Sequence, residues 1–123
     1  MNDKAETMVS IAYKALDEKK GNDIRVISLE GVSTIADFFI IASGDNANQV
    51  QALTDNCMEK LYKEGFEVKN VEGPQTNWVL MDYGDVVIHV FSKEDRLFYD
   101  LERIWRDGRV LDAQEIQNME HNS

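Results

Sequence analysis

Apolar residues recur in two parts of the chain with the three- and four-residue spacing of an amphipathic helix. The first part covers residues 3–20 and the second covers residues 45–65. This spacing gathers apolar side chains into one stripe, so each part is predicted to be a helix with one buried side. Gly21–Asn22 and Gly65 then tolerate the left-handed backbone that ends a helix. The two stripes are Met8, Ile11, Ala12, Ala15 and Leu16, and Val50, Leu53, Cys57 and Leu61.

Four further stretches have the composition of β-strands, namely residues 23–29, 36–44, 66–73 and 77–91. In residues 36–44 both alternating sets of side chains are apolar, which predicts a central strand that is covered on both faces. The last stretch contains the turn signal of Asp82–Asp85 and is therefore predicted to fold into a hairpin of two strands.

Residues 92–108 predict a third helix, because Ser92 can cap it and acidic residues fill its first turn. The order of elements predicts an α/β fold: a single domain with a mixed sheet of about five strands, packed with three helices. This domain is expected to cover residues 1–108. Residues 109–123, which end in the polar stretch "QNMEHNS", are expected to form a flexible, frayed tail.

The hairpin carries polar residues that an ordinary core strand would avoid. If Tyr83–Gly84 is a two-residue loop, Asp82 lies opposite Asp85 and Trp78 lies opposite His89. One face of this hairpin is then entirely apolar and belongs under the helices. The other face is an apolar platform with an acidic end, a mixture that is typical of protein interfaces. Its members are Trp78, Leu80, Asp82, Asp85, Val87, His89 and Phe91.

Each polar member of that platform also has a structural interpretation. Asp82 could simply shape the turn, Trp78 could lie under a helix, and His89 could be a sheet histidine with its hydrogen bonds satisfied. Two carboxylates that face each other across an antiparallel pair destabilise it by about 0.2–1 kcal/mol. That arrangement makes better sense if a basic partner neutralises them.

Charge and composition narrow the classes of partner. The 123 residues carry a net charge of −10, so direct capture of nucleic acid is disfavoured and a basic protein is the favoured partner. The alternative is that the acidity only keeps the protein soluble. No apolar run is long enough to span a membrane and no secretory signal is visible, so a cytoplasmic protein is expected. The single cysteine, Cys57, is expected to be a small buried hydrophobe.

No catalytic or cofactor-binding constellation can be assembled from the sequence. The chain has no Gly-rich phosphate loop, and its two histidines are His89 in a strand and His121 in the tail. Neither a metal site nor a cofactor is therefore expected. The strongest enzymatic alternative is a nucleotidyltransferase or a nucleotide-binding protein, because "ASGDN" at Ala42–Asn46 follows a strand and precedes a helix. The paired carboxylates that such an enzyme needs on one strand face are missing.

Several segments together resemble the ribosomal silencing factor family, also called the Iojap-like family. They are "STIADFFIIASGDNANQVQAL", Glu72–Gly73 followed by Trp78, "DYGDVVIHVF" and "RLFYDLERIW". The resemblance implies a nucleotidyltransferase-like fold without enzymatic activity. It also implies binding to the large ribosomal subunit through its fourteenth protein, L-fourteen, which blocks joining of the small subunit and represses translation when nutrients are short.

The resemblance also implies where the partner binds. By matching position, the partner-binding residues are expected at or near Trp78, Leu80, Met81, Asp82, Tyr83 and Asp85. Little direct contact with nucleic acid and no contact with a membrane are expected. Because members of the family form homodimers, a homodimer is a second association to consider.

Overall fold

The structure is a computed structural model that describes residues 3–31, 34, 36–73, 78–93 and 108–121 of the chain. The predicted helix at 92–108 lies almost wholly outside the described residues. The helices are α1 (Asp3–Glu18), α2 (Ala47–Lys63) and α4 (Ala113–His121). The strands are β1 (Asn22–Ser28), β2 (Phe38–Gly44), β3 (Asn70–Glu72), β4 (Trp78–Asp82), β5 (Val86–Ser92) and β6 (Arg109–Val110).

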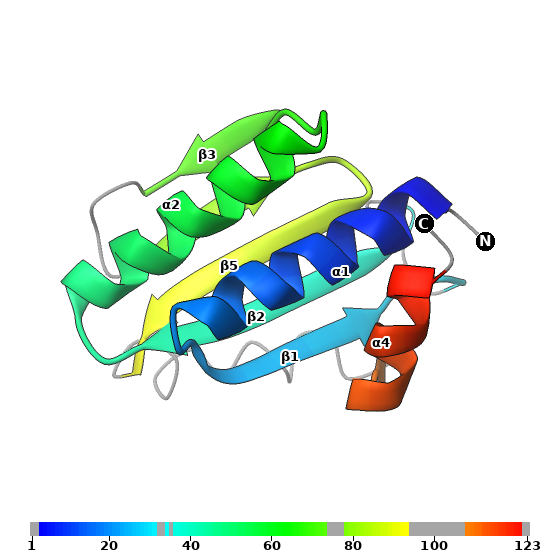
Figure 1. Cartoon of the computed structure of the whole chain (residues 1–123), viewed down its shortest axis with the longest axis horizontal. Coiled ribbons are helices and arrows are strands. Elements are labelled where there is room, and N and C mark those ends of the chain that lie inside the picture. Colours follow the sequence, from blue (N-terminus) through cyan, green and yellow to red (C-terminus); the bar gives the residue numbers. More distant parts are fainter. Residues whose placement is uncertain (1–2, 32–33, 35, 74–77, 94–107, 122–123) are drawn as a thin grey trace.

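The strands form one mixed sheet in the order β3-β4-β5-β2-β1-β6. Strand β2 runs parallel to β5, and the other four pairings are antiparallel. Helices α1 and α2 lie side by side over one face of this sheet, and α4 lies beside α1 at one end (Figure 1). The prediction of a single-domain α/β fold with a mixed sheet is therefore confirmed.

Strand β2 occupies the centre of the sheet, as its apolar composition predicts. All seven of its residues are buried. Phe38, Ile40 and Ala42 belong to the cluster that includes the helix side chains, whereas Phe39 and Ile41 belong to a second cluster on the opposite face. The sheet consequently has an apolar layer on both sides, and the described helices account for only one of them.

Small residues allow α1 and α2 to pack closely. Ala12 and Ala15 of α1 are completely buried, and their backbone carbonyls accept hydrogen bonds from α2. The Asn56 side-chain amide donates to the Ala15 carbonyl at 2.8 Å, and the Cys57 thiol lies 3.7 Å from the Ala12 carbonyl. Burial raises the pKa of Cys57 far above its usual range, which confirms that it is a small core residue.

The termini of the two long helices agree with the prediction except at the C-terminus of α1. Asn46, one of two candidates with Asp45, caps α2 by accepting the Gln49 N–H at 2.9 Å. Gly65 closes α2 with φ 90°, as predicted. At the end of α1 the left-handed residue is Lys20, with φ 60°, and not Gly21–Asn22. Gly21 instead donates to the Leu16 carbonyl, in a space where an added Cβ would lie 3.2 Å from Leu53.

The C-terminal segment is the largest departure from the prediction for the fold. Residues 109–110 pair with β1 as the edge strand β6, and α4 packs beside α1. Leu111, Ile116 and Met119 are each at most 7% exposed and belong to the main core. The expectation of a frayed tail is wrong for residues 109–121, because the burial of Leu111, Ile116 and Met119 binds this segment to the domain.

Strand β3 is shorter than predicted. Only Asn70–Glu72 of the stretch 66–73 pairs with β4. Phe66 and Val68, which precede the strand, pack against the core without joining the sheet. The apolar residues in this stretch thus reflect burial under the end of α2 and not a longer ladder of hydrogen bonds.

Candidate partner-binding surface

The β4–β5 hairpin has a different register from the predicted one. Trp78 lies opposite Phe91, Leu80 opposite His89 and Asp82 opposite Val87. The loop therefore consists of Gly84 and Asp85, one residue later than predicted, and every pair moves by two positions. A shift of two keeps each side chain on its predicted face. It also means that Asp82 and Asp85 do not oppose each other, so the predicted like-charge pair is wrong.

The turn itself explains this register. Gly84 has φ 89° and occupies the first of the two loop positions, which is typical of a type II′ hairpin turn. The Tyr83 N–H donates to the Val86 carbonyl at 2.9 Å, and the Gly84 N–H donates to the Asp82 carboxylate at 2.7 Å. The Asp85 carbonyl accepts from the N–H groups of Asp37 and Phe38, which ties the turn to β2. Asp82 thus shapes the turn with one oxygen of its carboxylate.

The two faces of the hairpin differ as predicted. Val79, Met81, Val86, Ile88 and Val90 are buried in the main core beneath the helices. On the other face five residues are neither fully buried nor fully exposed. We call these five the hairpin surface: Trp78, Leu80, Asp82, Asp85 and Val87.

Two of the six predicted partner-binding residues lie outside the hairpin surface. Met81 is completely buried on the helix side, so it supports β4 from behind and offers no surface. Tyr83 is 6% exposed, and burial raises its pKa to about 12. It borders a groove of about 660 Å³ beside the end of α2, lined by Met58, Glu59, Tyr62, Lys63, Phe66, Glu67, Val68 and Tyr83. The other four predicted residues do belong to the hairpin surface.

Aromatic rings form a continuous row behind the hairpin surface. The His89 ring centroid lies 4.5 Å from that of Phe39 on β2 and 5.7 Å from that of Phe91. The Trp78 ring lies 5.0 Å from Phe91, and its indole N–H donates to His89 Nδ1 at 3.0 Å. Phe91 is completely buried and His89 is 6% exposed, whereas Trp78 is only partly buried. The partly exposed indole is therefore held from below by buried rings.

His89 is a neutral imidazole in this row. Burial removes the imidazole from water and disfavours its charged form, which lowers the pKa of His89 to about 4. A neutral imidazole has one N–H and one acceptor nitrogen, so Nδ1 accepts and Nε2 carries the proton. His89 was not among the six predicted partner-binding residues. The sequence signal that links His89 to Trp78 is the alternation of side chains along the two strands, which places both residues on the same face of the hairpin.

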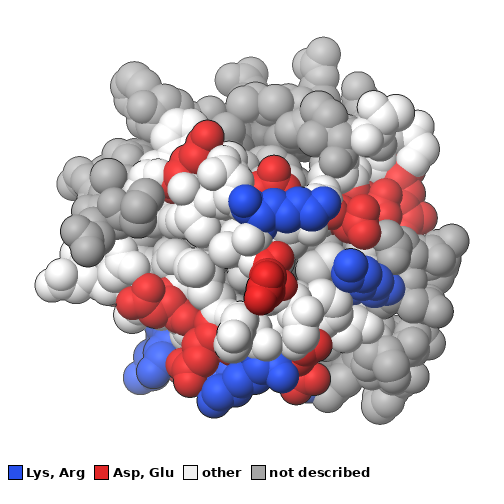
Figure 2. All heavy atoms as spheres, turned by 90° about the horizontal axis from the view of Figure 1, so that it is seen from above, with Lys and Arg blue, Asp and Glu red and all other residues white. Residues whose placement is uncertain are grey.

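Acidic and basic side chains alternate over the face of the molecule seen in Figure 2. In that view the described lysines and arginines are separated by carboxylates, so no continuous basic patch is formed among them. Several cations are also paired within the chain: Lys93 contacts Asp45 at 2.8 Å, and Lys63 contacts Glu59 at 3.1 Å. This distribution gives a phosphate backbone no broad cationic surface on that face.

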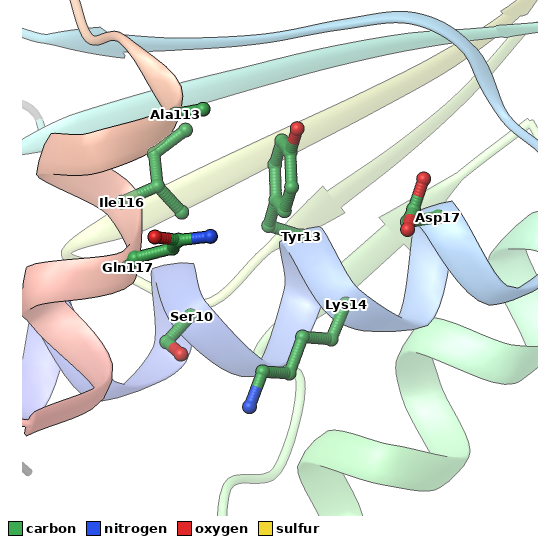
Figure 3. Close-up of a pocket in the computed structure, with 7 residues that line it drawn as sticks. All are labelled: Ser10, Tyr13, Lys14, Asp17, Ala113, Ile116 and Gln117. Carbon is green, nitrogen blue, oxygen red and sulfur yellow. The ribbon is translucent and has the colours of Figure 1, made fainter.

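A separate hollow of about 330 Å³ lies between α1 and α4 (Figure 3). It is on the helix side of the sheet and is thus separate from the hairpin surface. Its lining combines polar and apolar side chains: Ser10, Tyr13, Lys14, Asp17, Ala113, Ile116 and Gln117. Among the described residues, no group of three His, Cys, Asp or Glu side chains is arranged to hold a metal ion. None of the described helices is both long and apolar enough to cross a bilayer.

Comparison with known proteins decides what kind of protein carries this surface. The family model described as "Ribosomal silencing factor during starvation" matches residues 2–123. The chain belongs to the ribosomal silencing factor family. Among curated relatives, the ribosomal silencing factor of Bacillus subtilis is 41% identical over 91% of this chain and 94% of its own. That of Halalkalibacterium halodurans is 38% identical over 90% of this chain and 96% of its own.

The chain is also similar to a chloroplast protein and to a protein of solved structure. The chloroplast Iojap protein of Zea mays is 34% identical over 85% of this chain and 45% of its own. A crystal structure of a Chromobacterium violaceum protein matches with TM-score 0.79 and 34% identity, over 85% of this chain and 87% of that one. The predicted family is therefore confirmed. Because the curated bacterial relatives are named for silencing, a regulatory activity, membership fits the prediction that the chain is not an enzyme.

Proposed function

We propose that this protein binds the large ribosomal subunit with its hairpin surface, and that its bulk there blocks joining of the small subunit. The observation that carries the proposal is a partly exposed tryptophan and leucine on the sheet face opposite α1 and α2, in a chain of this family. Partly exposed apolar residues backed by a rigid row of rings are suited to protein contact, because little side-chain entropy is lost on binding. Repression would act when nutrients are short, in keeping with the family's description.

The partner within the subunit is proposed to be a basic protein, L-fourteen, and not ribosomal RNA. The net charge of −10 repels phosphates, whereas it attracts a cationic protein surface. Asp82 and Asp85 stand at the turn end of the hairpin surface and would meet lysines or arginines of the partner. Their charge would mainly speed the encounter, and the apolar contact of Trp78 would set the lifetime of the complex. The site of action would be the cytoplasm, where bacterial subunits join.

Co-sedimentation with isolated large subunits tests the proposal. Trp78→Ala should weaken binding by about 2 kcal/mol or more if the indole is an interface hot spot. Tyr62→Ala is the matched control, because Tyr62 is an aromatic residue of α2 on the other side of the sheet and is 67% exposed. Equal binding of the wild type and a folded Trp78→Ala variant would show that the partner-binding surface lies elsewhere.

A homodimer that uses the same surface is the competing association. Mass measured over a dilution series separates monomer from dimer, and purified L-fourteen added to the dimer tests whether the two contacts overlap. If L-fourteen binds without dissociating the dimer, the two surfaces are different.

A further inference from the structure

Trp78 does not point freely toward a partner, because its only polar atom is used inside the protein. The indole N–H donates to His89 Nδ1 at 3.0 Å, across the diagonal between β4 and β5. The two ring centroids lie 6.0 Å apart with the ring planes tilted by 38°. A hydrogen bond to a ring nitrogen constrains both the position and the plane of the indole, whereas ring packing alone allows the indole to slide and rotate.

The imidazole can fix the indole only because it is itself fixed. His89 lies at a central position of β5, with Ile41 of β2 beside it on one side and Leu80 of β4 on the other. Its ring contacts Phe39 and stacks on Phe91 at an interplanar angle of 8°. At 6% exposure, rotation of this ring would displace well-packed neighbours. The acceptor nitrogen is therefore held in place before any partner arrives.

We propose that His89 is a positioning residue for the partner-binding surface, which holds the Trp78 indole in its binding orientation by accepting its N–H. This inference rests on the proposed function, in which Trp78 contacts the partner. The same hydrogen bond also restricts which chemical groups of the partner can contact Trp78. Because the indole has one N–H and donates it to His89, Trp78 offers the partner only ring carbons. The partner group that meets it is then an aliphatic side chain or the stem and charge of a lysine or arginine above the ring.

The test compares two substitutions that separate the ring of His89 from its acceptor nitrogen. His89→Phe keeps a ring of similar size and removes the acceptor. His89→Asn removes the ring and keeps an acceptor, since the Asn Oδ1 takes nearly the position of His Nδ1. The first readout is the indole N–H signal of Trp78 in a proton–nitrogen correlation spectrum, assigned by its loss in Trp78→Phe. The second is co-sedimentation with large ribosomal subunits.

In the wild type the Trp78 indole N–H is expected downfield and slow to exchange with solvent. In His89→Phe it should move upfield and exchange faster, while subunit binding weakens by about three- to tenfold, the range expected when one large side chain must be ordered on binding. His89→Asn should restore both readouts in part. Tyr62→Ala is the control, because Tyr62 is 67% exposed on α2 and lies on the other side of the sheet, so both readouts should stay unchanged.

The outcomes separate this inference from the proposed function. If the wild type does not bind large subunits, the proposed function fails, and the indole signal still tests the contact between His89 and Trp78. If the wild type binds, and His89→Phe loses the downfield signal yet binds equally well, His89 is not a positioning residue although the proposed function stands. An unchanged indole signal in His89→Phe would overturn the inference at its first step.

Discussion

Lowering the pH from 7 to 5 should destabilise this protein through His89. The imidazole is buried among aromatic rings, and burial lowers its pKa to about 4 from the ordinary value of 6.5. Between these two values the unfolded chain binds a proton that the folded protein does not. Stability is therefore fully present above pH 6.5 and is lost as the pH falls through this window toward 4.

The size of the effect follows from the two pKa values. One pKa unit corresponds to about 1.4 kcal/mol, so the whole window contributes about 3 kcal/mol, of which about 2 kcal/mol is lost between pH 7 and pH 5. Most carboxylates remain ionised at pH 5, so they contribute less over this range. A loss of about 2 kcal/mol is a large part of the stability of an ordinary domain.

Urea unfolding at pH 7, 6 and 5 measures this loss, at a fixed protein concentration because self-association would raise the apparent stability. His89→Phe is the reference, since it keeps a ring and cannot titrate. His121, the only other histidine, is replaced by glutamine in both proteins. The wild type should lose about 2 kcal/mol more than His89→Phe between pH 7 and pH 5. Equal losses in the two proteins would refute the conclusion that the imidazole is buried in its neutral form.

Five further substitutions test other parts of the structure. Asp82→Asn keeps an oxygen for the Gly84 N–H and removes one charge, so it should slow association with the large subunit, mostly at low salt, and leave the unfolding midpoint nearly unchanged. Gly84→Ala and Gly65→Ala should each cost about 1–2 kcal/mol in urea unfolding, because both glycines have φ near 90°. A negligible loss in Gly84→Ala would contradict the turn described for the hairpin. Ile116→Ala should cost about 2 kcal/mol or more in urea unfolding, because Ile116 is on the buried side of α4. Gln117→Ala, at an exposed position of the same helix, should have little effect, and equal effects would mean that α4 is not packed on the domain.

The central parts of the fold were determined by local sequence. Strand β2 is predictable because both of its alternating sets of side chains are apolar, a composition typical of a strand covered on both faces. Helix α2 is predictable from its apolar stripe and from Asn46 and Gly65 at its ends. The two faces of the hairpin could also be assigned, because the alternation of side chains survives any register shift of two residues.

Other features depended on contacts between residues far apart in the chain. The sequence "DYGD" permits glycine in either loop position, so it does not determine the turn at Gly84 and Asp85. The hydrogen bonds from Asp37 and Phe38 that tie this turn to β2 come from outside that segment. The prediction of a flexible tail is wrong because Leu111, Ile116 and Met119 gain burial only against distant parts of the folded domain. Local sequence sets which side chains are available and which backbone conformations are low in energy. Only the packed structure decides which of the available burial sites and hydrogen-bond partners are used, as the contact between Trp78 and His89 illustrates.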